Sequence, residues 1–102
     1  MLKEWTLEDF VPQLGQAFCM QELDAQKELT LTDAKAVSGQ SGHARAPFVL
    51  LFRGPAGAAL PQRIYALQHE ELGAVELFLV PVGREGDSRD ATRPVLYEAV
   101  FN

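Results

Sequence analysis

The chain has 102 residues, of which 47% are hydrophobic and 23% charged, as in one ordinary globular domain. Its 14 acidic and 9 basic residues leave a formal charge of −5, which disfavours binding to nucleic acid or to an anionic membrane surface, because both depend on Lys and Arg. No apolar run approaches the roughly 20 residues that span a bilayer, and no signal-like stretch follows Met1. We therefore expect a single cytoplasmic domain over residues 1–102, with neither a nucleic-acid nor a membrane partner.

The N-terminal residues predict one short helix. Thr6 is a typical N-cap residue, and Trp5 and Phe10 have the spacing of a hydrophobic staple across it. Pro12 disfavours helical geometry in the residue before it, and Gly15 is a natural exit from the helix. We expect one or two helical turns here.

The rest of the chain indicates strands. Apolar, β-branched and aromatic residues alternate with polar ones in short segments, which Gly, Pro, Asp and Ser separate. The predicted strands cover residues 16–23, 27–37, 48–53, 63–68, 74–82 and 95–101. The third of these is apolar on both faces and is our candidate for a central, covered strand. Pro81 lacks an N–H, so the fifth strand should end there or lie at an edge.

Connection lengths favour an antiparallel arrangement. Residues 24–26 and 69–73 are short enough for hairpins, so consecutive strands should be neighbours in the sheet. A single open sheet of this size would leave one apolar face uncovered. We therefore predict an all-β fold, a small six-stranded antiparallel barrel with the short N-terminal helix closing one end, or alternatively a two-sheet sandwich.

Catalytic residues are sparse in this sequence. The one cysteine, Cys19, could act as a nucleophile only with His43 or His69 as its base. Its place within a strand favours a small buried thiol, and both histidines fall in connections where we expect them to be solvated. No serine lies in a nucleophile elbow. The loop serines are Ser38, Ser41 and Ser88.

No cofactor or metal is expected. Two histidines 26 residues apart, counting from 43 to 69, match no zinc spacing. The acids Glu85, Asp87 and Asp90 lie in a loop whose arginines should neutralise them, and this loop lacks the EF-hand pattern. The glycines of residues 53–59 precede no lysine or long helix that would favour phosphate binding.

Arg53 ends an apolar strand, where a buried guanidinium would need an acid. Glu76 or Glu98 could supply it from another strand, so we expect a structural ion pair rather than a ligand contact. The strand aromatics occupy positions suited to a core or a sheet face, and we expect core packing rather than stacking on bases. They are Phe18, Phe48, Phe52, Tyr65, Phe78, Tyr97 and Phe101.

Several stretches resemble one family across almost the whole chain. They are Thr6-Leu7-Glu8-Asp9-Phe10, Leu14-Gly15, Leu51-Phe52-Arg53-Gly54-Pro55, Leu60-Pro61-Gln62, Ile64-Tyr65, His69 with Leu72-Gly73, residues 76–81 and Tyr97-Glu98-Ala99-Val100-Phe101-Asn102. The family consists of small bacterial proteins and is catalogued as a domain of unknown function, with members often encoded near phage-tail-collar-like proteins. The resemblance brings no catalytic residues, and it implies a role beside tail-like assembly proteins.

The sequence therefore favours a non-catalytic interaction or assembly module, whose partner is a tail-collar-like protein or a second copy of the chain. We expect Phe78 and Val80 to offer a sheet edge for docking, with Arg53 and His69 as further interaction residues. One alternative is a carrier of a small apolar ligand, and another is a small hydrolase that uses a loop histidine.

Overall fold

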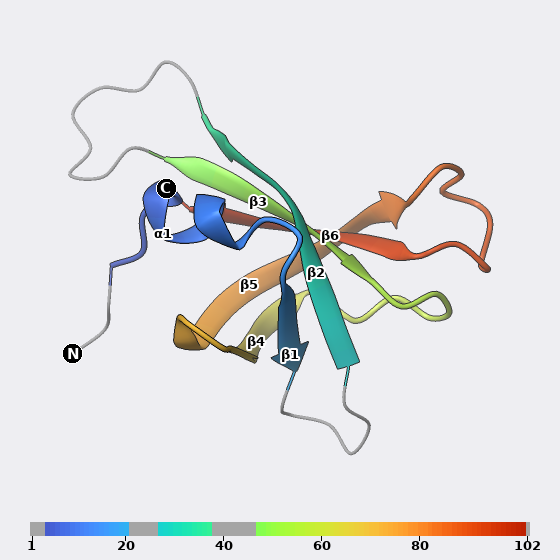
Figure 1. The fold of residues 1–102 in the computed structure, drawn as a ribbon. Helices are drawn as coiled ribbons and strands as arrows, with labels where there is room; N and C mark the ends of the chain where they lie inside the picture. The colour runs from blue at the N-terminus through green and yellow to red at the C-terminus, as the bar shows by residue number, and fades with distance from the viewer. Residues whose placement is uncertain (1–3, 21–26, 38–46, 102) are drawn as a thin grey trace.

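The computed structural model describes residues 4–20, 27–37 and 47–101, and the strands among them form a closed antiparallel barrel (Figure 1). The predicted barrel is confirmed, and the alternative of a two-sheet sandwich is wrong. The six strands are β1 (Ala17–Met20), β2 (Lys27–Ala36), β3 (Phe48–Gly54), β4 (Arg63–His69), β5 (Gly73–Arg84) and β6 (Val95–Phe101). Residues 21–23 of the first predicted strand and the predicted connection 24–26 fall outside the described residues.

The strand order around the barrel is β1-β2-β3-β6-β5-β4, and every neighbouring pair is antiparallel. Four pairs are consecutive in the chain, as expected. The exception is β3, which pairs with β6 along its whole length instead of with β4. β1 then closes the barrel against β4, where Cys19 lies opposite Gln68 and Met20 opposite Leu67.

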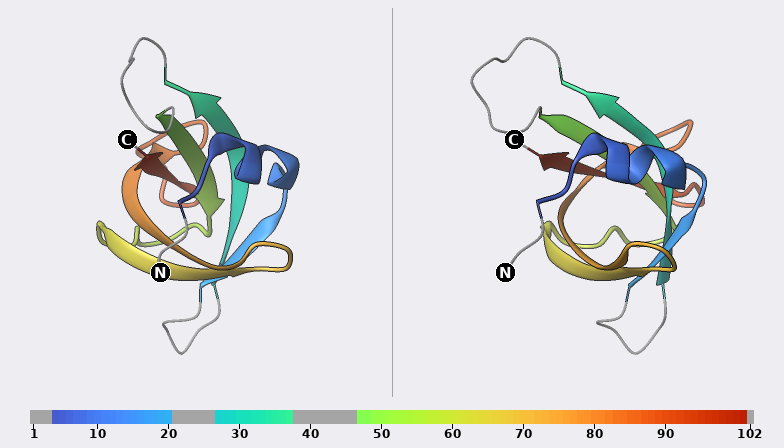
Figure 2. Two further views of the ribbon diagram at one scale, coloured as in Figure 1. Left: turned by 90° about the vertical axis from the view of Figure 1, so that its left-hand side faces the viewer. Right: turned by 60° about the vertical axis from the view of Figure 1, so that its left-hand side comes forward.

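A short helix covers one end of the barrel, as predicted (Figure 2). The helix α1 (Leu7–Phe10) continues into the 3₁₀ helix η1 (Val11–Gln13). The Thr6 N–H and hydroxyl both donate to the Asp9 carboxylate, at 2.9 and 3.1 Å, which fastens the first turn. The expected staple forms, with the Trp5 and Phe10 rings 5.5 Å apart. Among the described residues, no helix has the length and apolar character needed to cross a membrane.

The N-terminal helix belongs to the core through one aromatic side chain. Phe10 is fully buried, and its ring lies 6.4, 6.0 and 5.8 Å from the rings of Phe18, Phe48 and Phe101. These distances are typical of packed aromatic pairs. The helix is thus a hydrophobic plug for the barrel mouth.

Inward-facing side chains fill the barrel. β3 places Phe48, Leu50 and Phe52 inside, where all three are fully buried. The opposite face of β3 is half-buried, so the prediction that both faces are covered is wrong, because a closed barrel covers only its inner face. The largest fully buried side chains of the barrel include Tyr65 and Tyr97. Since the chain's own aromatic rings occupy the interior, the barrel offers no support for the alternative of an apolar-ligand carrier.

β5 continues past Pro81 instead of ending there. It pairs with β4 only as far as Leu79, opposite Arg63, and then pairs with β6 as far as Arg84. Among the described residues, β5 is therefore paired at Pro81 with β6 only. A register shift follows between Pro81 and Gly83. On the β4 side Pro81 has no partner strand in the described part of the chain, so its missing N–H leaves no backbone hydrogen bond unmade there. The strand therefore tolerates the proline.

The end of the barrel opposite α1 is closed by the connection between β3 and β4. The Leu60 N–H donates to the Tyr97 hydroxyl at 3.0 Å, and the Tyr65 hydroxyl donates to the Pro61 carbonyl. Gly54 ends β3 here, and a Cβ at this position would lie 2.8 Å from Leu29 Cδ2 and 2.9 Å from Tyr97 Cε2. Position 54 therefore requires glycine, because a Cβ there would collide with these two side chains.

Candidate functional site

The outer face of the barrel carries exposed apolar side chains on adjacent strands. Ile64 of β4 lies directly opposite Phe78 of β5, and their side chains are 59% and 48% exposed. On β6, Val100 is 53% exposed and lies opposite the half-buried Val49 of β3. We call these four residues the apolar stripe. It crosses β4, β5, β6 and β3, which are consecutive around the barrel.

The next outward positions along these strands flank the apolar stripe. Val80, two residues beyond Phe78, lies opposite Glu98, and Glu98 lies in turn opposite Leu51. On the other side, Glu76 precedes Phe78 by two residues and is exposed. Outward positions recur every second residue, so these carboxylates point to the same face as the stripe.

The predicted docking edge needs correction in its geometry. Phe78 is paired through its backbone with Ile64 on the β4 side, and the pairing of β5 with β6 begins at Val80, so β5 is a wall strand of the closed barrel and not a free edge strand. Its side chain and that of Val80 face outward from the wall of the barrel. Ile64 and Val100, which are also exposed on this face, were not among the predicted interaction residues. The alternation of 63–68, in which Tyr65 and Leu67 form the inner set, was the signal that could have identified Ile64.

Arg53 lies away from the apolar stripe. It forms an ion pair, as predicted, although with a different acid. Its partner is Glu85, at 3.4 Å, and not the predicted Glu76 or Glu98. β3 and β6 place Arg53 opposite Leu96, next to the start of the loop after β5. Both charged side chains are partly exposed, so the pair contributes about 1 kcal/mol or less.

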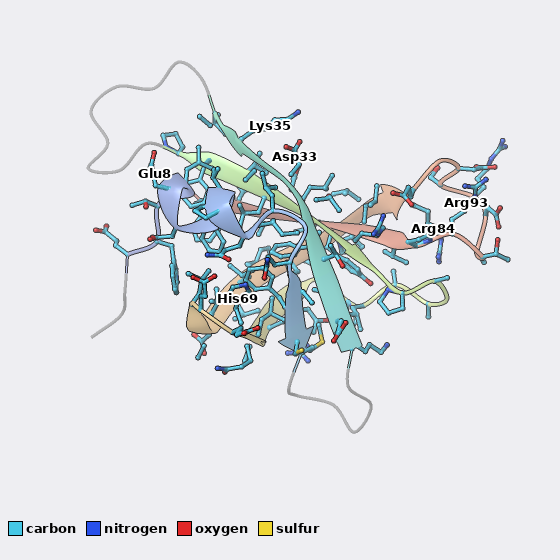
Figure 3. All side chains as sticks on the ribbon, viewed as in Figure 1. Glu8, Asp33, Lys35, His69, Arg84 and Arg93 are labelled. Atoms are coloured by element: carbon cyan, nitrogen blue, oxygen red, sulfur yellow. The ribbon has the colours of Figure 1, made fainter. Side chains whose placement is uncertain are left out.

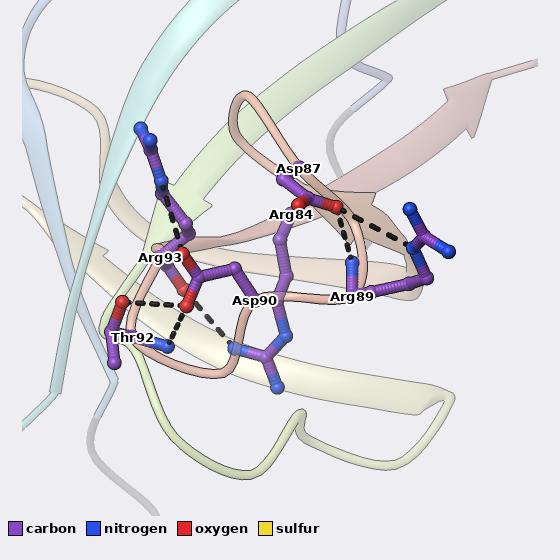
Figure 4. Close-up of polar contacts among 6 residues, drawn as sticks. All are labelled: Arg84, Asp87, Arg89, Asp90, Thr92 and Arg93. Atoms are coloured by element: carbon purple, nitrogen blue, oxygen red, sulfur yellow. Dashed lines mark hydrogen bonds and ion pairs between the residues drawn. The ribbon is translucent and has the colours of Figure 1, made fainter.

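The acids of the β5–β6 loop are engaged by neighbouring residues (Figure 4). Asp87 lies 3.9 Å from the Arg89 guanidinium, and Asp90 lies 3.6 Å from that of Arg93. Asp90 also accepts hydrogen bonds from the Thr92 hydroxyl and backbone N–H, at 2.6 and 2.9 Å. These bonds hold the pKa of Asp90 below its usual 3.8. The predicted neutralisation of these acids by arginines is confirmed for Asp87 and Asp90.

Arg84 joins the two loops at this end of the barrel. Its guanidinium donates to the carbonyl of Arg93 at 3.1 Å and to the carbonyl of Gly57, in the β3–β4 connection. The Gly57 N–H donates in turn to the Ala91 carbonyl at 3.3 Å. All three acceptors are backbone carbonyls, which indicates a structural clasp. Arg84 and Arg93 are labelled at this end of the molecule in Figure 3.

His69 is buried, contrary to the solvated turn expected from the sequence (Figure 3). It is 2% exposed, and its ring lies 4.5 Å from that of Phe18. Its Nδ1 accepts the N–H groups of Glu71 and Leu72, at 3.0 and 3.1 Å, and so caps the β4–β5 turn. Its Nε2 and the Oε1 of the buried Gln13 have no hydrogen-bond partner within the described part of the chain. The predicted role of His69 in surface interactions is wrong, because its ring faces the core.

Cys19 and His69, weighed as a candidate nucleophile and base, do not face each other. Cys19 lies opposite Gln68 in the register and faces outward, half-buried, with its Sγ 3.9 Å from Glu28 Oε2. His69 is the next residue after Gln68, so its side chain points to the inner face. The predicted buried thiol is also incorrect. Ser88 is exposed in its loop, while His43, Ser38 and Ser41 lie outside the described residues. Within the described ranges, no cluster of His, Cys, Asp and Glu is suited to a metal ion.

The comparison with known protein families covers nearly the whole chain. A family described as "Domain of unknown function (DUF6916)" matches residues 5–101. The chain belongs to the DUF6916 family. This match confirms the part of the sequence resemblance that concerns a domain of unknown function, and the matched region contains every strand of the barrel. Searches of the curated proteins and of the solved structures found no match.

Proposed function

We propose that this DUF6916 protein is a non-catalytic interaction module, and that the apolar stripe is its docking surface. The observation that carries this proposal is the alignment of Ile64 with Phe78 on neighbouring strands, both about half exposed. A large aromatic side chain in an apolar surface row is typical of protein interfaces and is uncommon on surfaces that contact only water.

The stripe has the properties of a rigid interface. The backbone pairs Ile64 with Phe78 and Val49 with Val100, and all four strands belong to the closed barrel, so the positions of these residues are largely set before a partner arrives. A preorganised surface avoids much of the entropic cost of ordering on binding. Phe78 is the expected hot spot, because aromatic side chains contribute disproportionately at the centre of interfaces.

The gene neighbourhood implied by the sequence resemblance makes a tail-collar-like protein the first partner to test. The experiment is affinity purification with such a neighbouring gene product, using the wild type and Phe78→Ser. Val82→Ser is the matched control, because Val82 is 49% exposed on the same strand but lies outside the stripe. We expect capture to be lost in Phe78→Ser alone. Equal capture by both variants, with both still folded, would reject the stripe as the docking surface.

A further inference from the structure

The charged residues beside the apolar stripe differ in whether a residue of opposite charge already forms an ion pair with them. Among the described residues, Glu76 and Glu98 form no ion pair. Lys35, opposite Val49, lies 3.3 Å from Asp33, and the two side chains are labelled next to each other in Figure 3. Arg53, diagonal to Glu98 in the β3–β6 register, lies 3.4 Å from Glu85. The uncompensated charges on this part of the outer face are therefore negative.

A second cation, Arg63, precedes Ile64 in β4. Its guanidinium lies 4.1 Å from the centroid of the Tyr65 ring and donates to the Ile64 carbonyl at 3.0 Å. Both of these contacts are with groups of its own strand, and neither is with the carboxylates of β5 and β6.

The two carboxylates flank the stripe on opposite sides. Glu76 precedes Phe78 on the side of the β4–β5 turn. Glu98 lies opposite Val80, on the side of the β5–β6 loop. From Glu76 to Val80 is four residues of strand, which corresponds to about 13 Å along the barrel wall. An apolar centre is thus bordered by one negative charge at either side.

This arrangement argues against a second copy as the occupant. Two stripes brought face to face would place uncompensated carboxylates on both surfaces, in a chain whose formal charge is already −5. Like charges across an interface oppose association, whereas opposite charges favour encounter and set specificity.

We propose that the partner presents an apolar segment with Lys or Arg on both sides, separated by about 13 Å, so that the cations meet Glu76 and Glu98. This inference rests on the proposed function, because it names the partner chemistry of the same stripe. In an extended partner segment, positions i and i+4 on one face have this spacing, with the apolar residue between them at i+2.

A bead-displayed library of random peptides tests the chemistry without assuming it. Immobilised wild-type protein selects binders, and the affinity of a selected peptide is then measured for four variants. The variants are Phe78→Ser, Val82→Ser, the double variant Glu76→Gln/Glu98→Gln, and Glu70→Gln, whose carboxylate is exposed in the β4–β5 turn as a matched control. Thermal unfolding confirms that each variant is folded.

We expect selected peptides to carry Lys or Arg on both sides of an apolar residue. Their binding should be lost in Phe78→Ser and weakened about tenfold in the double glutamine variant, while Glu70→Gln and Val82→Ser bind as the wild type does. Added salt should weaken the wild type more than the double variant.

Two results would overturn the inference and leave the proposed function standing. One is a set of peptides that need Phe78 but show no basic bias and are insensitive to the double variant. The other is a concentration-dependent dimer of the wild type that Phe78→Ser dissociates, since the occupant would then be a second copy. Peptides that bind Phe78→Ser as well as Val82→Ser, or the selection of no binder, would count against the proposed function itself.

Discussion

The Tyr97 hydroxyl accepts a hydrogen bond from the Leu60 N–H, over 3.0 Å, at the barrel end opposite the helix. Both residues are buried, so this bond satisfies a backbone donor that water cannot easily reach. It also connects the β3–β4 connection to β6, which is distant from it in the chain. The phenol oxygen of Tyr97 is thus one of the groups that hold this end of the barrel together.

Removing that oxygen should destabilise the barrel. Tyr97→Phe leaves the Leu60 N–H without an acceptor, and we expect a loss of about 1 to 3 kcal/mol in the free energy of unfolding. Urea denaturation measures it. Tyr65→Phe is the control, because its hydroxyl donates to the less buried Pro61 carbonyl and its loss should cost less. Equal costs for the two variants would contradict the importance given to the Leu60 contact.

Alkaline pH should weaken the fold through the same residue. Burial raises the pKa of Tyr97 above its usual 10.0, because the folded state disfavours the phenolate. The stability that the neutral phenol contributes is therefore complete below pH 10.0, and it is lost as pH rises through the raised pKa of the folded state. Denaturation midpoints followed from neutral pH to beyond 10.0 should fall more steeply in the wild type than in Tyr97→Phe.

Gly54→Ala should be destabilising, although the backbone conformation there does not require glycine. Its Cβ would lie within 3 Å of Leu29 and Tyr97, both packed in the core, so one of them has to shift. We expect a loss of about 1 to 3 kcal/mol. Gly57→Ala provides the comparison, because φ is +101° there but no atom lies within 4 Å. Thermal unfolding of the two variants separates crowding from backbone strain, and a neutral Gly54→Ala would disprove the close contact.

His69 should act as a structural cap of the β4–β5 turn. His69→Phe keeps a ring against Phe18 but removes the acceptor for the N–H groups of Glu71 and Leu72, so we expect a loss of about 1 to 2 kcal/mol. Hydrogen exchange should accelerate at those two amides. His69→Asn can restore an acceptor without the ring, and protection of the amides in that variant would separate capping from packing. Unchanged exchange in His69→Phe would refute the cap.

Arg84 should matter to the loops more than to global stability. Arg84→Met removes the donors to the Gly57 and Arg93 carbonyls, so we expect faster proteolysis and hydrogen exchange in residues 55–62 and 85–94. The free energy of unfolding should change by less than about 1 kcal/mol, because these contacts are solvent-accessible. Arg89→Met is the matched control, since Arg89 is exposed and does not join the two loops. Identical protease sensitivity in both variants would argue against the clasp.

The failed expectations for Arg53 and His69 have a common cause, which is that they concern contacts between distant segments. Glu85 pairs with Arg53 only because β3 and β6 are neighbours and the β5–β6 loop begins beside them. His69 is buried because β4 closes against β1, which brings Phe18 alongside its ring. Neither neighbour can be inferred from residues close to Arg53 or His69 in the chain.

The amino-acid sequence by itself determined the short capped helix, the positions of the six strands and most of the residues that face inward, although it misplaced Cys19, His69 and the exposed Phe78. These depend on capping, turn chemistry and period-two alternation, which are properties of a few adjacent residues. Only the tertiary structure decided that β3 pairs with β6 and β1 with β4, and therefore that Ile64, Phe78 and Val100 share one outer face. Pairing between distant strands follows from closing the barrel around a filled core, and alternation along one strand carries no information about which strand lies beside it.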